Sequence, residues 1–405
     1  MMKGLLKLIA FSTILFTQPL SAQVSWRQIE KDVRLLAADD MEGREIGTKG
    51  ELMAATYIAN RFQEFGLLPF NQKSYFQPFT KLSYAHPHDT IGITLMGRNV
   101  IGMIDHRASK TIVIGAHFDH LGWGKESSLY VGEAAIHNGA DDNASGVAGL
   151  LYLAKKLKQV QLNHNVIFIA FSGEEKGLLG SNYFVHDSIF HQESISFMMN
   201  MDMIGRLDSN RRISIGGVGT AKEFIPAIQK SNSFGFDIKY DSSGIGPSDH
   251  TSFYLKNIPV LHFFTGQHAD YHKPTDDAEW INYQGINEIG DLIFKIIVQL
   301  DELQQISFQK TKEEQKSSVK GFKVTLGIMP DYLFSGNGVR IDGVKDNRPA
   351  AIAGLQAGDI IMAIDQMMIA NLQDYMRALQ SYDSGDKVTI KVKRAEKTLQ
   401  FKVRF

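Results

Sequence analysis

The sequence predicts an α/β protein: a three-layer αβα domain around a mixed, mostly parallel sheet, followed by a small, mostly-β domain. From about Ser25 to Gln304, short apolar runs of strand length alternate with helix-like segments. Near-continuous apolar strands are typical of a sheet that helices cover on both faces. The last eighty or so residues are mainly strand-like, and 405 residues are enough for two domains.

The individual elements follow from the spacing of apolar residues. Strands are predicted at 111–117, 165–172, 195–202, 211–217 and 258–264. Helices are predicted at 26–38, 51–67, 146–157, 221–230 and 287–303, and the second should stop at Gly66. In the last part of the chain, a helix is expected at 372–379 and strands at 387–394 and 398–405.

The N-terminus predicts a secretory signal peptide over residues 1–22. Lys3 and Lys7 precede an apolar run at 8–16, and small residues lead to Ala22. The run is too short for a permanent membrane anchor, and the alternative is a buried N-terminal helix. We therefore expect an exported protein, periplasmic or extracellular, that is not an integral membrane protein after cleavage.

Composition excludes several kinds of chemistry. The chain has no cysteine, so disulfides and thiolate ligands are excluded, and a metal would have to be held by His, Asp and Glu. Lys plus Arg (43) nearly balance Asp plus Glu (44), and no basic stripe stands out. Nucleic acid is therefore not an expected partner.

Metal-ligating residue types follow successive predicted strands. They are His117, Asp119, Glu174, Glu175, Asp202 and His272, together with the Asp141–Asp142 pair in a turn. Taken singly, each could be a surface histidine, a solvated acidic pair or a helix cap. Strand ends meet at one edge of an α/β sheet, and gathered carboxylates repel unless a cation neutralises them. The pattern predicts a metal site, with zinc as first candidate and manganese or cobalt next.

Five segments together resemble one enzyme family. They are "GAHFDHLG", "GADDNASGVA", "FSGEEKGLLGS", "NMDMIG" and "SDHTSFYLKNIPVLHFFTGQHADYHKPTDD". Their order resembles the motifs of the co-catalytic two-zinc aminopeptidases, the bacterial leucyl aminopeptidase type, which are related to glutamate carboxypeptidase. The resemblance spans about Trp26 to Leu303. It implies two Zn²⁺ per chain and removal of residues from peptides with free N-termini.

The resemblance also implies a ligand set. His117 and Asp202 would hold one zinc, Glu175 and His272 the other, and Asp141 would bridge them. The peptide bond after the bridging residue, 141–142, is expected to be cis. Asp142 would only order the turn, and Asn143 or Ser145 would cap the helix that follows.

Further roles are expected around these ligands. Glu174 would act as general base on a metal-bridged water, and Asp119 would hydrogen-bond His117. Met203, Phe263 and Phe264 are candidates for the substrate pocket, with core packing as the alternative. His120, His250 and His268 are expected to support the ligands or the fold without binding metal themselves, and His137 is expected to lie in a loop. Ile245 stands where bacterial relatives have a tyrosine hydroxyl that helps to hold the carbonyl oxygen.

The C-terminal part, 321–405, resembles a PDZ domain of bacterial protease type. The resemblance rests on "GVRIDGVKDNRPAAIAGLQAGDIIMAIDQMMIANLQDYMRAL". Leu326, Gly327 and Ile328 look like the carboxylate-binding loop, although Thr325 replaces the usual leading Gly. A C-terminal peptide ligand is therefore possible here, and the alternative is a PDZ fold without a ligand. The expected division is a signal peptide at 1–22, a peptidase domain at 23–304, a linker at 305–320 and the PDZ domain at 321–405.

Two other functions remain open at this point. A glutaminyl cyclase would use the same scaffold with a single zinc as an acyltransferase. A non-catalytic binding ectodomain would have the fold without turnover. The complete set of ligands together with Glu174 favours the peptidase.

Overall fold

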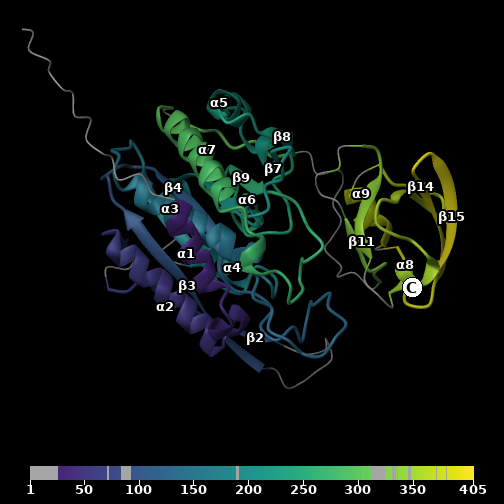
Figure 1. Ribbon diagram of the computed structural model, residues 1–405. Coiled ribbons are helices and arrows are strands. Elements are labelled where there is room, and N and C mark those ends of the chain that lie inside the picture. The colour runs from purple at the N-terminus through teal and green to yellow at the C-terminus, as the bar shows by residue number, and fades with distance from the viewer. Residues whose placement is uncertain are drawn as a thin grey trace, which may run out of the picture.

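The computed structural model describes residues 26–70, 73–83, 93–187, 191–303, 305–311, 324–330, 334, 336–344, 348–370, 372–379 and 381–405. The predicted signal peptide and most of the predicted linker lie outside these residues. Within them, no helix is both long and apolar enough to cross a membrane. Figure 1 shows two lobes, a large one coloured purple to green and a small one coloured green to yellow.

The large lobe is built on a nine-stranded mixed sheet with the order β1-β3-β5-β4-β6-β9-β7-β8, and β2 pairs with β3. The strands are β1 (Leu68–Pro69), β2 (Phe76–Ser83), β3 (Ile93–Ile104), β4 (Thr111–His117), β5 (Asn165–Phe171), β6 (Ile195–Met201), β7 (Arg212–Gly216), β8 (Asp237–Tyr240) and β9 (Val260–Phe264). The central run β5-β4-β6-β9 is parallel. Their carboxyl ends therefore lie at one edge.

The central strands are buried on both faces, as their apolar runs predict. Along β4, Ile112, Ile114 and Ala116 face one core cluster, and Val113 faces another on the opposite side. This alternation follows from the two-residue period of a strand. It explains why the run Ile112–Ala116 contains only apolar residues and a glycine: each face of the sheet packs against its own layer of helices.

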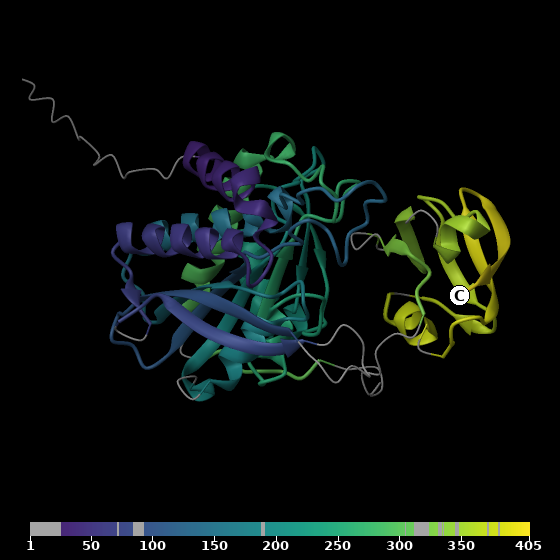
Figure 2. The same ribbon diagram turned by 90° about the horizontal axis from the view of Figure 1, so that it is seen from below.

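Helices form the two outer layers. The first core cluster takes side chains from α1 (Trp26–Leu36), α2 (Lys49–Glu64), α3 (Gly146–Leu157), α5 (Phe224–Ser231) and α7 (Tyr283–Asp301). The second takes them from α4 (Leu179–His186) and α6 (His250–Tyr254). Figure 2 shows the purple helices on one side of the sheet. The predicted three-layer αβα architecture is confirmed.

The chain continues along the large lobe after α7. Ile306 is buried in the first core cluster, and the ring of Phe308 lies 5.5 Å from that of Tyr254. Gln309 donates its N–H to the carbonyl of Thr220 at 2.7 Å. The described part of the predicted linker, 305–311, is thus packed on the large lobe.

The small lobe is an antiparallel sheet with two helices and its own core. Its strands are β10 (Ile328–Pro330), β11 (Val339–Val344), β12 (Ile360–Ile364), β13 (Met367–Met368), β14 (Lys387–Arg394) and β15 (Lys397–Arg404), in the order β10-β11-β12-β14-β15 with β13 on β12. The helices are α8 (Pro349–Ala353) and α9 (Leu372–Leu379). The predicted small, mostly-β domain is confirmed.

Candidate metal centre

The carboxyl ends of the central strands bring the predicted ligands together. His117 is the last residue of β4, and Asp202 directly follows β6. Glu175 lies in the turn that follows β5. In this turn, Gly173 has a φ of +76°. His272 comes from the long loop after β9. These four predicted ligands therefore surround one point at the edge of the sheet.

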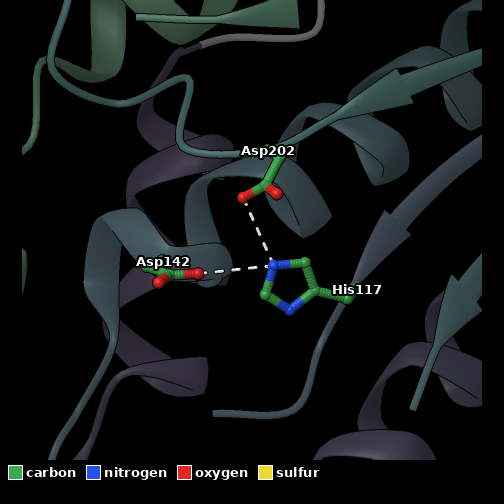
Figure 3. Close-up of side chains that lie close together, drawn as sticks. All are labelled: His117, Asp142 and Asp202. Atoms are coloured by element: carbon green, nitrogen blue, oxygen red, sulfur yellow. Dashed lines mark hydrogen bonds and ion pairs between the residues drawn. The ribbon is translucent and has the colours of Figure 1, made fainter. Parts of the chain in front are cut away.

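Asp142 lies at the centre of this group. Its Oδ1 is 3.3 Å from His117 Nε2, and its Oδ2 is 3.2 Å from His272 Nε2. Asp202 Oδ1 completes the first group at 3.3 Å from His117 Nε2 (Figure 3). Glu175 Oε2 completes the second at 3.4 Å from His272 Nε2. One carboxylate thus links two sets of possible metal ligands.

The prediction that Asp141 is the shared carboxylate is wrong. Asp141 Oδ1 accepts the N–H of Gly205 at 2.6 Å, and its Oδ2 lies 3.2 Å from His268 Nε2. The cis peptide bond is Asp142–Asn143, not 141–142. The two carboxylates face different neighbours, because adjacent residues of the turn project in different directions.

The turn is held by bonds that the sequence did not reveal. Asp276 Oδ2 accepts the backbone N–H groups of both Asp141 and Asp142, at 2.9 and 3.0 Å. Asn143 Oδ1 accepts the N–H of Gly146 at 3.0 Å, where α3 begins, and the N–H of Met203 at 3.1 Å. Asn143 therefore caps the helix as expected and ties the turn to the end of β6.

Asp119 acts differently from its expected role. The Nδ1 of His117 lies 3.2 Å from the carbonyl oxygen of Asp119, and the carboxylate Oδ1 is 3.8 Å away. The two carboxylate oxygens instead accept the N–H groups of Glu174 and Glu175, at 3.1 and 3.4 Å. Asp119 thus joins the loop after β4 to the glutamate turn after β5.

His120 belongs to the second group, which the sequence interpretation missed. Its Nδ1 is 2.9 Å from Glu175 Oε1 and 3.9 Å from Asp142 Oδ2, and the side chain is fully buried. The only signal in the sequence is its position one residue after Asp119. Glu175 is therefore contacted by two imidazoles, those of His120 and His272.

Ionisation in the centre follows from burial and from neighbouring charges. Burial alone would raise the pKa of Asp142, yet hydrogen bonds with His117 and His272 hold it well below its ordinary range. For Glu174 burial dominates, and the charges of Glu175 and Asp202 add to it, so its pKa is raised well above the ordinary value. The two roles differ: Asp142 is held as an anion, while Glu174 has a high affinity for a proton.

A fully buried cation supports the backbone of the centre. Arg44 donates Nε to the carbonyl of Phe118 at 2.7 Å and Nη2 to that of Gly139 at 2.9 Å. Its Nη1 donates to the carbonyls of Leu36 and Asn138, at 2.6 and 2.7 Å. Burial lowers the pKa of Arg44 to about 10, so it remains charged at neutral pH. Arg44 thus joins the segment after His117 to the segment before Asp141.

Arg44→Lys is expected to destabilise the fold by about 2–4 kcal/mol and to weaken zinc binding by about tenfold. Lysine keeps the charge but cannot reach four carbonyl groups with a planar fork. Thermal unfolding and competition with a zinc chelator measure the two effects. Arg211→Lys is the matched control, because Arg211 is partly exposed and pairs with Glu288 at 2.7 Å. Equal effects of the two substitutions would contradict the role of Arg44.

A cleft of about 1360 Å³ opens over the centre. Of the predicted pocket residues, Met203 and Phe264 line it, whereas Phe263 is buried in the first core cluster. The prediction for Phe263 is therefore wrong: adjacent residues of β9 face opposite sides of the sheet. Ile245 also lines the cleft and offers no hydroxyl, but Tyr240 and Tyr271 are among the lining residues.

The residues present fit zinc. In a tetrahedral site with bonds of about 2.0–2.1 Å, neighbouring ligand atoms lie about 3.3 Å apart. The N–O separations around Asp142 are 3.2–3.4 Å. The ligand atoms are imidazole nitrogens and carboxylate oxygens, which zinc prefers when thiolates are absent. Asp142 presents one oxygen to each group, an arrangement in which one carboxylate can serve two ions.

Both parts of the chain resemble known proteins. Residues 99–297 match the model of peptidase family M28, and residues 296–405 match that of the PDZ domain. Aminopeptidase YwaD of Bacillus subtilis is 27% identical over 209 residues, which cover 48% of this chain and 43% of that protein. The chain thus spans less than half the length of this curated relative.

Solved structures share the fold. A Zn-dependent exopeptidase from Parabacteroides distasonis superposes with a TM-score of 0.57 at 19% identity, covering 68% of this chain and 98% of that one. The glutaminyl cyclase of Bacteroides thetaiotaomicron gives 0.55 at 22% identity, with coverage of 68% and 98%. Two stretches of this chain thus match known families: residues 99–297 match the M28 peptidases, and residues 296–405 match the PDZ domain.

Proposed function

We propose that this protein is a zinc-dependent aminopeptidase that hydrolyses the N-terminal peptide bond of peptides. The observation that carries the proposal is the carboxylate of Asp142, shared between the His117–Asp202 and Glu175–His272 groups. Two such groups call for two zinc ions per chain. Aminopeptidases among the relatives support the same reaction class.

The protein groups have separate tasks in this reaction. Bound zinc would polarise the scissile carbonyl and lower the pKa of the attacking water. Glu174 lines the cleft beside the ligands, where a carboxylate can act as general base on an attacking water. Its carboxylate accepts the proton of the water and then passes it to the leaving amine nitrogen. Asp119 positions Glu174 through the backbone N–H.

The first residue of the substrate would lie in the part of the cleft lined by Met203, Ile245 and Phe264. His250 and His262 form a stacked pair in the same region, with ring centroids 4.4 Å apart. Burial lowers the pKa of both imidazoles, so both remain neutral. This environment favours an uncharged, largely apolar N-terminal side chain.

The N-terminal sequence supports export to the periplasm or the cell exterior, where peptides would be the substrates. Peptides bearing different N-terminal residues, each with a free or an acetylated N-terminus, test the activity. We expect release of the first residue only from peptides with a free N-terminus, and two zinc ions per chain by elemental analysis. Absence of release from every peptide would refute the proposal.

A glutaminyl cyclase is the second candidate, because the likeness in fold to the Bacteroides thetaiotaomicron enzyme is comparable. The two groups around Asp142 argue against it, since a single-zinc enzyme needs only one. One tightly bound zinc per chain, together with cyclisation of N-terminal glutamine, would establish the cyclase instead.

A further inference from the structure

The cleft over the metal centre has a second wall, formed by the PDZ domain. Catalytic-domain residues of the cleft include Glu174, Asp202 and Lys239. The opposite wall consists of Pro330, Phe334, Gly336, Gly338, Val339 and Ala370. Lys239 at the end of β8 donates its Nζ to the carbonyl of Phe334 at 2.5 Å, so the walls touch. Figures 1 and 2 show the PDZ lobe beside the large lobe.

The predicted peptide groove of the PDZ domain runs along β10, and these wall residues lie towards its far end: Pro330 ends β10 and pairs with Ile341 of β11, which begins at Val339. A peptide binds such a domain by adding as a strand beside an exposed sheet edge, with its terminal carboxylate held by backbone N–H groups. In the described part of the chain, β10 stands at the edge of its sheet. The predicted carboxylate loop, Leu326–Ile328, leads into the start of β10, and Pro330 is the last residue of this strand.

A positively charged side chain lies beside the predicted carboxylate loop. Gly327 has φ +72°, and the loop is tied to α8 by the N–H of Ala350, which donates to Leu326 O at 2.9 Å. The stem of Arg348 lies against Gly327, since a Cβ added there would come within 2.3 Å of Arg348 Cβ. Arg348 is exposed and adds positive charge. The N–H of Gly327 meanwhile donates to Thr325 Oγ1 at 3.1 Å, where a carboxylate oxygen could replace the hydroxyl.

The direction of a bound peptide follows from these positions. A carboxylate at the loop lies at the start of β10, so the rest of the peptide extends along β10 towards Pro330. The carbonyl of Ala370, just before α9, accepts the N–H of Gly338 at 2.9 Å, so the start of α9 lies beside the start of β11 at this end. Pro330, Gly338 and Ala370 all line the cleft that contains Glu174 and Asp202. The N-terminal part of the peptide therefore points into the cleft.

We propose that one linear peptide is held at both ends, its C-terminal carboxylate at the loop beside Arg348 and its N-terminus at the metal centre. The proposal rests on the aminopeptidase function and names its substrate class: peptides long enough to span both sites. Joining two weak sites by one chain raises the effective affinity without new contacts. Shorter peptides reach only the metal centre and gain nothing from their carboxylate.

Two series of peptides test this, with the same N-terminal residue, increasing length, and either a free or an amidated C-terminus. We expect equal KM values for short members, and beyond a threshold length a KM at least about tenfold lower for the free acids. In Arg348→Glu the advantage of the free acid should disappear, and Arg348→Lys should keep most of it. Lys397→Glu, a charge reversal at an exposed position of the same domain, should behave as the parent.

Several outcomes would overturn the proposal. One is equal KM for acid and amide at every length, and another is an advantage that survives in a folded Arg348→Glu protein. A third outcome uses an N-acetylated free-acid peptide, whose binding is measured by fluorescence anisotropy. If this peptide binds while acid and amide substrates turn over alike, the PDZ domain binds a separate partner and not the substrate. Failure to release residues from any peptide would refute the aminopeptidase function itself, so the two failures are distinguishable.

Discussion

Glu174→Gln is expected to lower kcat by about 10²–10⁴-fold while zinc remains bound. Glutamine keeps the size of the side chain and the backbone bond to Asp119, but it cannot take a proton from water. KM should change little, because the ligands around Asp142 are untouched. Turnover of an aminoacyl-nitroanilide and the zinc content after dialysis measure the two effects.

Glu175→Gln is the control for this prediction, since the two glutamates are adjacent and equal in size. Glu175 contacts both His120 and His272, at 2.9 and 3.4 Å, so its substitution should lower the zinc content as well as the activity. The assignment would be reversed if Glu174→Gln lost zinc and Glu175→Gln kept it.

Asp142→Asn is expected to weaken zinc binding at both positions, by more than about 100-fold. One oxygen of Asp142 faces His117 and the other faces His272, and an amide offers a single good acceptor without charge. Side chains that only hydrogen-bond to metal ligands contribute about 10–100-fold to metal affinity. A ligand shared by two zinc ions should therefore contribute more. Titration with zinc in the presence of a competing chelator measures the loss.

Asp141→Asn is the matched comparison. An asparagine can still accept the N–H of Gly205 through Oδ1, while its contact with His268 is weakened. We expect zinc affinity within about tenfold of the parent and a lower melting temperature. A larger loss of zinc in Asp141→Asn than in Asp142→Asn would restore the assignment made from the sequence.

Much of the fold could be predicted from the sequence. The boundaries of β4, α3, α9 and β14 agree with the predicted ranges, because each of these elements has either a continuous apolar run or a clear apolar periodicity. β2 and β3 were not predicted. Their residues alternate between exposed and buried less regularly, as along Leu95–Asn99, since this side of the sheet is only partly covered. A weak pattern of this kind does not distinguish a strand from a loop.

The residues of the candidate site were likewise predicted only in part from the sequence. The strand-end pattern predicted that His117, Glu175, Asp202 and His272 gather at one edge together with other acidic residues, because parallel strands bring their carboxyl ends to the same edge. The family resemblance then singled out these four as metal ligands. Arg44 was missed, since its role depends on four carbonyl groups, two of them more than ninety residues away along the chain. No local pattern reports such contacts.

The sequence by itself determined the fold class, the PDZ domain and the chemistry of the possible metal ligands. Only the tertiary structure decided between neighbours of equal chemistry: Asp142 rather than Asp141, and Phe264 rather than Phe263. The two residues of each pair have the same side chain and adjacent positions in the sequence. Their side chains nevertheless leave the backbone in different directions. Which direction meets the cleft depends on how the turn and strand pack against the rest of the molecule.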